Sequence, residues 1–332
     1  MATTYRAVML PKKGGPEVLQ VVELPVEPPK AGQLRIRVHA AGVGATDFAV
    51  LAGTYMFAPK IPLVPGYEVA GVVDAVGSGV SGFQVGQRVA ALTVYGAFAE
   101  LLVREAEHFL PIPDGVSDRD AAAVILNFVT AWQMIHRTAK VQAGRTALVT
   151  GASGGVGTAA LQLLRLAGVK AYGAASPSKH ATVRALGAIP VDYRAGRLDR
   201  LMRGLEPAGI DYVFDAVGGP NIGPAIGALR RGGHLVGFGF IGARGGLAVA
   251  AMFAHILLGS RLRGRRGSFY GISGQYRKDP KPFREDLPKI FALLAEKKID
   301  PLVEHTFPLL RARQALELLA GGSVAGKIVL VE

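Results

Sequence analysis

Short runs of alternating apolar and polar residues dominate the first part of the chain. Segment 33–40 (QLRIRVHA) places apolar side chains at every second position, as a strand with one buried face does. Glycine-rich turns such as Gly77-Ser78-Gly79 punctuate the region. Further short apolar runs lie at 69–76, 86–92 and 97–103. We expect a compact, barrel-like sheet over about the first 120 residues.

Strand-like and helix-like segments alternate in the middle of the chain. Segment 146–150 (TALVT) is a short apolar strand, and 156–167 is helical, with Val156, Ala160 and Leu164 on one face. Further strands are expected at 171–174, 211–214 and 234–238, and further helices at 120–137, 178–186 and 222–229. This alternation predicts an α/β fold: a doubly wound parallel sheet with helices on both faces.

The last part of the chain returns to a pattern that cannot form a domain alone. Residues 284–297 are an amphipathic helix, and 327–331 (KIVLV) is a terminal strand. We therefore predict that this tail completes the N-terminal domain. One domain then comprises residues 1–123 and 268–332, and the α/β domain of residues 124–267 is inserted within it.

Composition narrows the class of protein. A length of 332 residues suits two domains of roughly 150 residues each, and 50% hydrophobic residues are typical of a packed globular protein. The absence of cysteine excludes disulfides, thiolate zinc sites and a cysteine nucleophile. The start of the chain is too polar for a signal peptide, and the longest apolar run, 247–258, has 12 residues where a membrane span needs about 20. We expect a cytoplasmic protein that does not enter a membrane.

The net charge of +13 is unevenly distributed. Acidic residues are absent from 121–191 and from 216–278, and the second stretch carries the arginine-rich run Arg261–Arg266. Such a surface would suit a domain that holds a polyanion. A solvated basic face explains the same charges, so nucleic acid stays an alternative partner and not the favoured one.

The strongest local motif is the glycine-rich segment 151–157 (GASGGVG). It directly follows the TALVT strand and opens the helix that starts at Val156, which is the context of a dinucleotide-binding loop. Small residues let backbone N–H groups approach a pyrophosphate, and the N-terminus of the helix attracts negative charge. An ordinary strand-to-helix turn is the alternative.

The end of the next strand bears on the choice of cofactor. About 20 residues after such a loop, a site for NAD places an acidic residue against the ribose 2′-hydroxyl. Here the segment reads Ser176-Pro-Ser178-Lys179-His180 and contains no acid. A hydroxyl and an ammonium suit a 2′-phosphate, so NADP(H) is the predicted cofactor.

Several motifs together resemble the medium-chain dehydrogenase/reductase superfamily. They are AGVGATD (41–47), PLVPGYEVAGVV (62–73), VGSGV (76–80), VGQRV (85–89) and GASGGVG, and the similarity runs nearly end to end. Within it the chain resembles the zinc-free, NADPH-dependent quinone oxidoreductase (zeta-crystallin-like) branch, near the vesicle-amine-transport-protein-like members. The resemblance implies a Rossmann domain inserted in a GroES-like β-barrel catalytic domain. It also implies a homodimer, in which the apolar run 247–258 would take part.

The positions of the superfamily's zinc ligands hold other residues in this chain. Zinc-dependent members carry Cys at the position of Gly44, His at that of Tyr67 and another Cys near Leu126. The four-cysteine structural lobe is missing as well, because the chain runs straight through 95–104. The resemblance therefore implies an enzyme without zinc or another metal.

The resemblance also implies which residues bind the cofactor. Residues 153–156 match the pyrophosphate loop, and Ser176, Lys179 and Tyr193 match residues that hold the 2′-phosphate. Thr130, two residues at the end of a later strand and two in the segment after it match the surroundings of the nicotinamide. The implied set is Thr130, Ser153, Gly154, Gly155, Val156, Ser176, Lys179, Tyr193, Phe238, Gly239, Phe269 and Tyr270.

Without a metal, the chemistry favours an acceptor that stabilises its own anion. The nicotinamide transfers the hydride, and a quinone or an α,β-unsaturated carbonyl needs no strong Lewis acid. Tyr55 matches a tyrosine of the family's substrate pocket, and Tyr67 could donate a hydrogen bond to a carbonyl, so these two are the candidate catalytic residues. Asp47 and Glu68 are expected to be structural. Gly44 stands where quinone reductases often have Asn, which leaves a different substrate open.

We therefore favour an NADPH-dependent oxidoreductase that reduces a quinone or an α,β-unsaturated carbonyl without a metal. Two alternatives stay open. One is an NADPH-binding tailoring enzyme of a biosynthetic pathway. The other is a protein that binds NADPH or nucleic acid with little turnover, which the basic run Arg261–Arg266 would permit.

Overall fold

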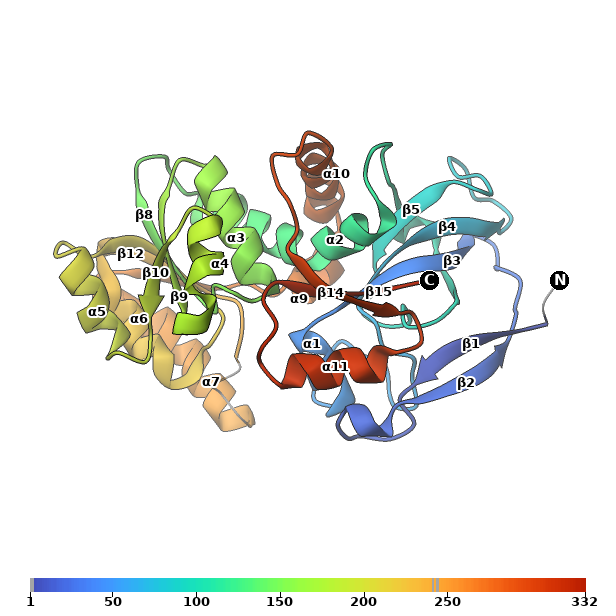
Figure 1. Ribbon diagram of the computed structural model, residues 1–332, viewed down its shortest axis with the longest axis horizontal. Coiled ribbons are helices and arrows are strands. Elements are labelled where there is room, and N and C mark those ends of the chain that lie inside the picture. The colour runs from blue at the N-terminus through green and yellow to red at the C-terminus, as the bar shows by residue number, and fades with distance from the viewer. Residues whose placement is uncertain (1–2, 241, 243–244) are drawn as a thin grey trace. The chain divides into compact units, whose positions relative to one another are not determined.

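The chain divides into two units, each with its own sheet (Figure 1). In the computed structural model, which describes residues 3–240, 242 and 245–332, one unit comprises Met1–Val129 with Tyr276–Glu332, and the other is Thr130–Gln275. The predicted boundaries, after residues 123 and 267, lie a few residues earlier. Both fall inside elements that continue past them, helix α2 (Asp118–Trp132) and strand β13 (Arg266–Phe269).

Strands from both ends of the chain form the main sheet of the first unit. Its order is β14-β15-β3-β4-β5-β7, and β6 also pairs with β3. The strands are β3 (Gln33–Val43), β4 (Glu68–Val76), β5 (Arg88–Leu92), β6 (Leu101–Glu105), β7 (Leu110–Pro111), β14 (Val303–Pro308) and β15 (Lys327–Val331). A separate antiparallel hairpin joins β1 (Thr4–Met9) to β2 (Gln20–Pro25).

The C-terminal strand β15 lies beside β3 in this sheet. The two strands are antiparallel, with Ile328 opposite Val43, and β14 pairs with β15 on its other side. Figure 1 shows the red strands β14 and β15 next to the blue β3. This pairing brings Lys327, near the end of the chain, close to the segment that leaves β3 at Val43.

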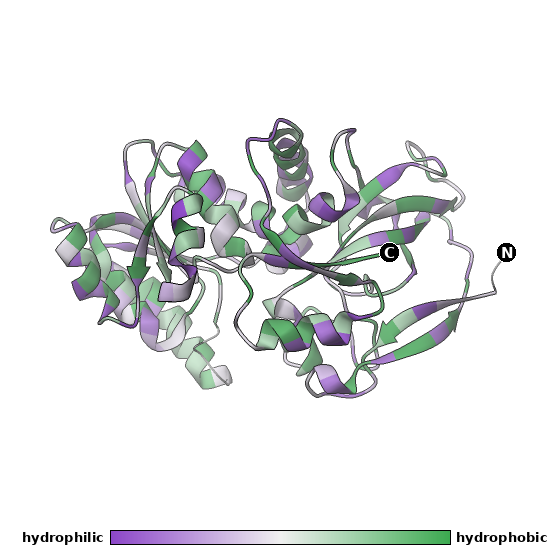
Figure 2. Cartoon of the chain, viewed as in Figure 1, coloured by the Kyte–Doolittle hydropathy of each residue, from purple (hydrophilic) through white to green (hydrophobic). Residues whose placement is uncertain are grey.

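The alternation of residues along β3 explains which of its faces is buried. Leu34 and Ile36 are fully buried. Arg35 and Arg37 point to the other face, where both guanidinium groups form ion pairs with Asp74. The strands of this unit accordingly carry both hydrophobic and hydrophilic stretches (Figure 2). The period of two thus places one row of side chains in the core and one outside it.

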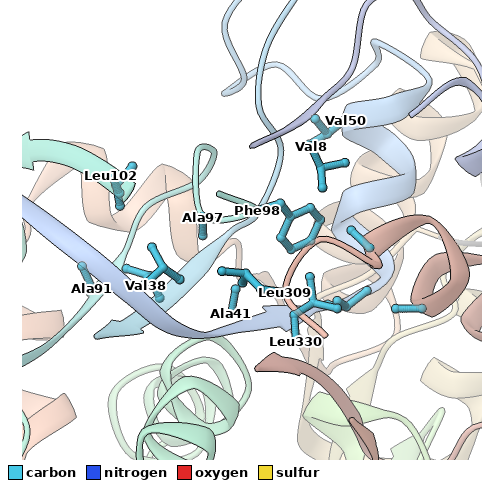
Figure 3. Packing of buried hydrophobic residues seen from close by; sticks show 14 of the residues in the cluster. Val8, Val38, Ala41, Val50, Ala91, Ala97, Phe98, Leu102, Leu309 and Leu330 are labelled. Atoms are coloured by element: carbon cyan, nitrogen blue, oxygen red, sulfur yellow. The ribbon is translucent and has the colours of Figure 1, made fainter. Parts of the chain in front are cut away.

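The core of the first unit gathers side chains from distant parts of the chain (Figure 3). Phe98 is fully buried and lies among Val8, Leu309 and Leu330. Burial of a phenylalanine side chain stabilises a fold by roughly 1.5–3 kcal/mol. The tail is therefore part of this core and not an appendage to it.

The first unit also contains helices, which come from both the N-terminal and the C-terminal parts of the chain. They are α1 (Ala45–Leu51), α10 (Lys281–Ala295) and α11 (Ala312–Ala320), while α2 and α9 (Ile272–Lys278) cross the boundaries between the units. The predicted helix 284–297 corresponds to α10, which begins three residues earlier, at Lys281. A proline at position 282 suits that start, since the first helical turn needs no N–H donor there.

A six-stranded parallel sheet organises the second unit. Its order is β10-β9-β8-β11-β12-β13. The strands are β8 (Thr146–Thr150), β9 (Lys170–Ala175), β10 (Ile189–Asp192), β11 (Ile210–Asp215), β12 (Leu229–Gly237) and β13. Counted from β8 as the first strand, the order is 3-2-1-4-5-6, the dinucleotide-binding arrangement with its switch point between β8 and β11. The predicted α/β fold with a doubly wound parallel sheet is confirmed.

Helices follow most of these strands, as expected for right-handed crossovers. They are α3 (Gly155–Leu166), α4 (His180–Ala185), α5 (Leu198–Leu205), α6 (Ile222–Ala228), α7 (Gly246–Ala254) and α8 (Ser260–Leu262), with π-helical turns at Gln133–Ala139 and His255–Gly259. Every residue of β11 is buried, because helices cover the central strands. Across the described part of the chain, none of the helices has the length and apolar character that crossing a membrane requires.

Candidate functional site

The glycine-rich loop between β8 and α3 has the backbone that close approach of a ligand requires. Gly151 has φ +62°, a left-handed conformation that favours glycine. At Gly157, a Cβ atom would lie 2.2 Å from the carbonyl oxygen of Gly151, so no larger residue fits. These two glycines let the chain turn from the strand directly into the helix.

The N-terminus of α3 has no side-chain cap. Gly154 precedes the helix with φ −81°, and no side chain bonds to the first N–H groups. Ser153, Gly155 and Val156 flank this position and are half-buried. The first N–H groups of a helix have no partner within it, and the helix dipole is positive there, so the loop suits a pyrophosphate. The four residues predicted for this role lie together as the sequence implies.

The residues predicted to hold a 2′-phosphate follow two neighbouring strands. β9 and β10 are parallel, with Ala175 opposite Asp192, so the segments after them begin at the same edge of the sheet. Ser176 follows β9, and its hydroxyl lies 3.2 Å from that of Ser178. Tyr193 follows β10 and is half exposed.

One cation at this edge was not singled out from the sequence. The guanidinium of Arg194 lies 5.7 Å from the centre of the Tyr193 ring. Its backbone N–H bonds to the Asp192 carboxylate, which fixes the turn after β10. Arg194 could have been found from its position next to Tyr193. Together with Lys179 it gives this edge two positive charges against the one carboxylate of Asp192.

Thr130 carries a buried hydroxyl that no protein group satisfies. Its Oγ1 atom is shielded from solvent and has no hydrogen-bond partner among the residues described. A buried polar group without a partner is costly, so a bound ligand that reached this hydroxyl would gain by completing its hydrogen bonding. With the open helix N-terminus and the cationic edge of β9 and β10, the second unit fits a dinucleotide.

The four residues predicted near the nicotinamide lie after β12 and at the end of β13. Gly237 pairs with Phe269 at the ends of these strands, so Phe238 and Tyr270 leave the sheet at the same edge, and the Tyr270 N–H donates to the Gly237 carbonyl oxygen. A Cβ atom at Gly239 would lie 2.1 Å from the Ala216 carbonyl oxygen, which explains the glycine.

Two of these four side chains have partners within the second unit. The Tyr270 hydroxyl donates to Oε1 of Gln133 at 2.6 Å, and the tyrosine is buried. The Phe269 ring packs edge-on against Phe253, with the ring centres 4.6 Å apart. Tyr270 therefore supports the position of the strand end with its ring, while its hydroxyl is already bonded.

The two predicted catalytic tyrosines contact each other in the first unit. Tyr55 follows α1, and Tyr67 immediately precedes β4. Their hydroxyl oxygens are 2.5 Å apart and their rings meet edge to face. Burial, then the Tyr55 hydroxyl and the nearby carboxyl groups of Asp47 and Glu68, raise the pKa of Tyr67 well above its ordinary value. Tyr67 is therefore a neutral hydroxyl at physiological pH and can donate a hydrogen bond.

A buried ion pair lies beside Gly44, Tyr67 and Leu126, the three positions that hold zinc ligands in zinc-dependent members of the superfamily. Lys327 of β15 pairs with Glu68 of β4, and both side chains are buried. The backbone N–H of Leu126 donates to the other oxygen of Glu68 at 2.6 Å. A Cβ atom at Gly44 would lie 3.6 Å from the Lys327 ammonium. Within the described ranges, no group of three or more His, Cys, Asp or Glu residues could hold a metal ion.

Asp47 completes this cluster. It lies in α1 and is 1% exposed, and its Oδ2 accepts a hydrogen bond from the Gly44 backbone N–H at 2.9 Å. The interpretation of Asp47 and Glu68 as structural groups from the sequence did not include Lys327. Lys327 and its partner Glu68 are 259 residues apart in the sequence, and no local pattern could reveal the pair.

Comparisons with known proteins agree with both units. Residues 30–114 match the family model described as alcohol dehydrogenase GroES-like domain, and residues 186–330 match the one described as zinc-binding dehydrogenase. The first match confirms the predicted GroES-like domain.

Several named proteins are similar in sequence to this chain over nearly its whole length. A human synaptic vesicle membrane protein VAT-1 homolog-like is 30% identical over 99% of this chain and 81% of its own length. A quinone oxidoreductase from Rattus norvegicus is 30% identical over 98% of this chain and 97% of its own. The structure of the quinone oxidoreductase from Coxiella burnetii superimposes with a TM-score of 0.84 at 27% identity, over 99% of both chains.

Proposed function

Because the chain belongs to the medium-chain dehydrogenase/reductase superfamily, in its quinone oxidoreductase and VAT-1-like branch, we propose that it is an NADPH-dependent oxidoreductase. The proposed reaction is the transfer of a hydride to a quinone or an α,β-unsaturated carbonyl without a metal ion. The observation that carries the choice of NADPH is the segment after β9, where Ser176, Ser178 and Lys179 stand in place of the acid of an NAD site.

The second unit supplies the binding of the cofactor. The N–H groups at the start of α3 hold the pyrophosphate, and the hydroxyl of Thr130 is the donor or acceptor left for the bound dinucleotide. Lys179 and Arg194 neutralise the 2′-phosphate, while the hydroxyl of Ser176 bonds to it. When bound, the nicotinamide supplies the hydride.

The first unit supplies a hydroxyl donor for the acceptor's oxygen. Hydride addition to a quinone or an enone places negative charge on that oxygen. The Tyr67–Tyr55 pair donates a hydrogen bond to it and then a proton, which yields the hydroquinone or, from an enone, the enol that tautomerises to the saturated carbonyl. Since a conjugated anion is already stabilised, a hydrogen bond from a neutral phenol is sufficient to hold its charge before the proton is transferred.

The apolar segment of the second unit supports a homodimer, which we also propose. Leu247 of α7, Leu258 of the π-helical turn after it and Leu262 of α8 are 90%, 62% and 87% exposed. β13 is the edge strand of its sheet. Light scattering of the protein and of a Leu258→Asp variant tests this, with Leu205→Asp on α5 as the matched control. A monomeric parent protein would rule the dimer out. The proposed compartment is the cytoplasm.

Oxidation of NADPH by the purified protein tests the proposed function. An ortho-quinone and an enone serve as acceptors, and NADH is run in parallel. We expect turnover with NADPH well above that with NADH. Binding of NADPH without turnover of either acceptor would exclude the proposed reaction and favour a tailoring or binding role.

A further inference from the structure

One oxygen of Asp47 is buried without a partner. Oδ2 accepts the hydrogen bond from the Gly44 N–H, but no described residue bonds to Oδ1, which is shielded from solvent. An ionised carboxylate with a bare, buried oxygen would forfeit most of its hydration. A proton on Oδ1 removes the charge and leaves Oδ2 free to accept the bond from Gly44. The geometry therefore favours the acid form and fixes which oxygen carries the proton.

The charges around Asp47 also favour the acid form. Lys327 of β15 is the one cation beside it in the described cluster, and that ammonium is already paired with Glu68 of β4. Tyr67, which precedes β4, is neutral. With Asp47 ionised, the buried cluster would hold two carboxylates against one ammonium. With Asp47 protonated, the cluster is neutral, which lowers the cost of burying it.

The pKa of Asp47 agrees with this balance. Burial raises it to about 7, in spite of the opposing effects of the Gly44 N–H and the Lys327 ammonium, and the charge of Glu68 adds to the increase. Its charge is in turn one of the influences that raise the pKa of Tyr67. Asp47 and the tyrosine pair are thus coupled, and Asp47 can gain and lose its proton near neutral pH.

We propose that Asp47 stores an exchangeable proton on Oδ1 and returns it to the Tyr67–Tyr55 pair after that pair has protonated the reduced substrate. The inference rests on the proposed function. Asp47 acts through the tyrosines and is a positioning residue in that sense. No hydrogen bond joins Asp47 to Tyr67 among the described residues, so the proposal requires a water molecule to reach Oδ1 during turnover and to carry the proton between them.

The proton balance of the step is complete. Hydride from NADPH adds to the acceptor, and the electron pair of the carbonyl moves to its oxygen. That oxygen takes the proton of a tyrosine hydroxyl, which leaves a tyrosinate and, from an enone, gives an enol that tautomerises to the saturated carbonyl with no net gain or loss of protons. The tyrosinate takes the Oδ1 proton of Asp47, which becomes a carboxylate until solvent reprotonates it. The net reaction consumes one hydride and one proton, as reduction of a quinone or an enone requires.

Infrared spectroscopy of the protein without ligands tests the storage of the proton. We expect the carbonyl band of a protonated carboxyl group that fades as the pH rises through about 7. The band should be missing in Asp47→Asn and unchanged in Asp114→Asn, which removes an exposed acid of the same unit. Labelling aspartate with carbon-13 assigns the band without any substitution, should Asp47→Asn fail to fold. A carboxylate at Asp47 throughout pH 5 to 9 would overturn the proposal.

The pH profile of turnover tests delivery of the proton. In the parent protein we expect kcat to fall by about tenfold per pH unit above the pKa of Asp47, while the Kd of NADPH stays constant. Asp47→Asn should lose this limb and show a low, flat kcat. A limb that persists in Asp47→Asn would show that the proton comes from elsewhere. No turnover of quinone or enone by the parent protein would refute the proposed function and the delivery step together, and the infrared band would then decide the storage alone.

Discussion

Lys327 and Glu68 form a buried ion pair that joins the last strand of the chain to β4. Their side chains are 4% and 0% exposed, and the backbone N–H of Leu126 satisfies the second oxygen of Glu68. The pair is therefore fully withdrawn from water, and each charge depends on the other.

Replacing Lys327 by Met should destabilise the first unit strongly. The change leaves the buried Glu68 charge without compensation, which costs about 3–5 kcal/mol. Urea unfolding at neutral pH measures it. The double variant with Glu68→Gln should recover part of the loss, because it removes the orphaned charge.

Lys298 offers a matched control for this prediction. It pairs with Glu296, and both side chains are more than half exposed. Lys298→Met should therefore cost no more than about 1 kcal/mol. Equal losses at the two positions would contradict the importance of burial at Lys327.

The stability of the protein should depend on the protonation of Asp47. Its pKa is raised to about 7 in the folded protein from an ordinary value of 3.8, so the folded state holds the proton more tightly. This contribution is complete below about pH 4 and is lost as the pH rises through about 7. Asp47→Asn, which cannot ionise, should therefore gain in stability over the parent protein as the pH rises from 5.5 to 8.5. Urea midpoints at the two pH values test this, and a pH-independent difference would contradict it.

Gly157→Ala should prevent binding of the dinucleotide and destabilise the second unit by about 1–3 kcal/mol. The added Cβ would lie 2.2 Å from the Gly151 carbonyl oxygen, so the loop must shift. Fluorescence titration with NADPH and urea unfolding measure the two effects. The control is Gly204→Ala in α5, where a Cβ meets nothing within 4 Å. That variant should bind NADPH normally and gain roughly 0.5–1 kcal/mol in stability.

Lys179→Ala and Arg194→Ala should each weaken binding of NADPH and leave that of NADH unchanged. A hydrogen bond to a charged group contributes about 1.5–3 kcal/mol, which corresponds to roughly a 10- to 100-fold increase in Kd. Calorimetric titration with both nucleotides measures the selectivity. Arg184→Ala removes a cation from α4, away from the strand ends, and should change neither Kd. Equal weakening of both nucleotides would contradict a role at the 2′-phosphate.

Tyr67→Phe should lower kcat about 100-fold with the Kd of NADPH unchanged, since the removed hydroxyl is the proposed acid. Tyr55→Phe should have a smaller effect, because Tyr67 keeps its own proton. Steady-state kinetics with an ortho-quinone measure both. Tyr276→Phe removes a hydroxyl of the same unit that bonds to His108, and its kcat should match that of the parent protein. A fully active Tyr67→Phe would exclude this tyrosine as the acid.

The elements that the sequence revealed are those with a complete local pattern. The alternation of 33–40 predicted β3, although the strand runs on to Val43. β13 escaped prediction because its sequence, RGSF, has no apolar pattern, and its strand character comes from pairing with β12. β10 is short and contains Pro190, which argues against a strand from sequence alone.

The residues of the candidate site also fall into those that a local sequence pattern reveals and those that only the folded structure reveals. The glycine loop and the end of β9 are each a few consecutive residues, so their chemistry was readable directly from the sequence. The tyrosine pair was identified residue by residue, but the contact between the two hydroxyls was not. Arg194 and Lys327 were missed, because their importance lies in what they face.

The sequence by itself determined the α/β class, the dinucleotide loop and the lack of cysteine ligands, because each is set by neighbouring residues or by composition. Only the tertiary structure decided that Lys327 neutralises Glu68, that no described residue bonds to Oδ1 of Asp47, and that Tyr55 meets Tyr67. The Lys327–Glu68 pair depends on β15, which pairs with β3 from the other end of the chain, and the other two relations depend on how the folded chain buries these side chains. Electrostatic consequences follow from such nonlocal contacts, and no local pattern contains them.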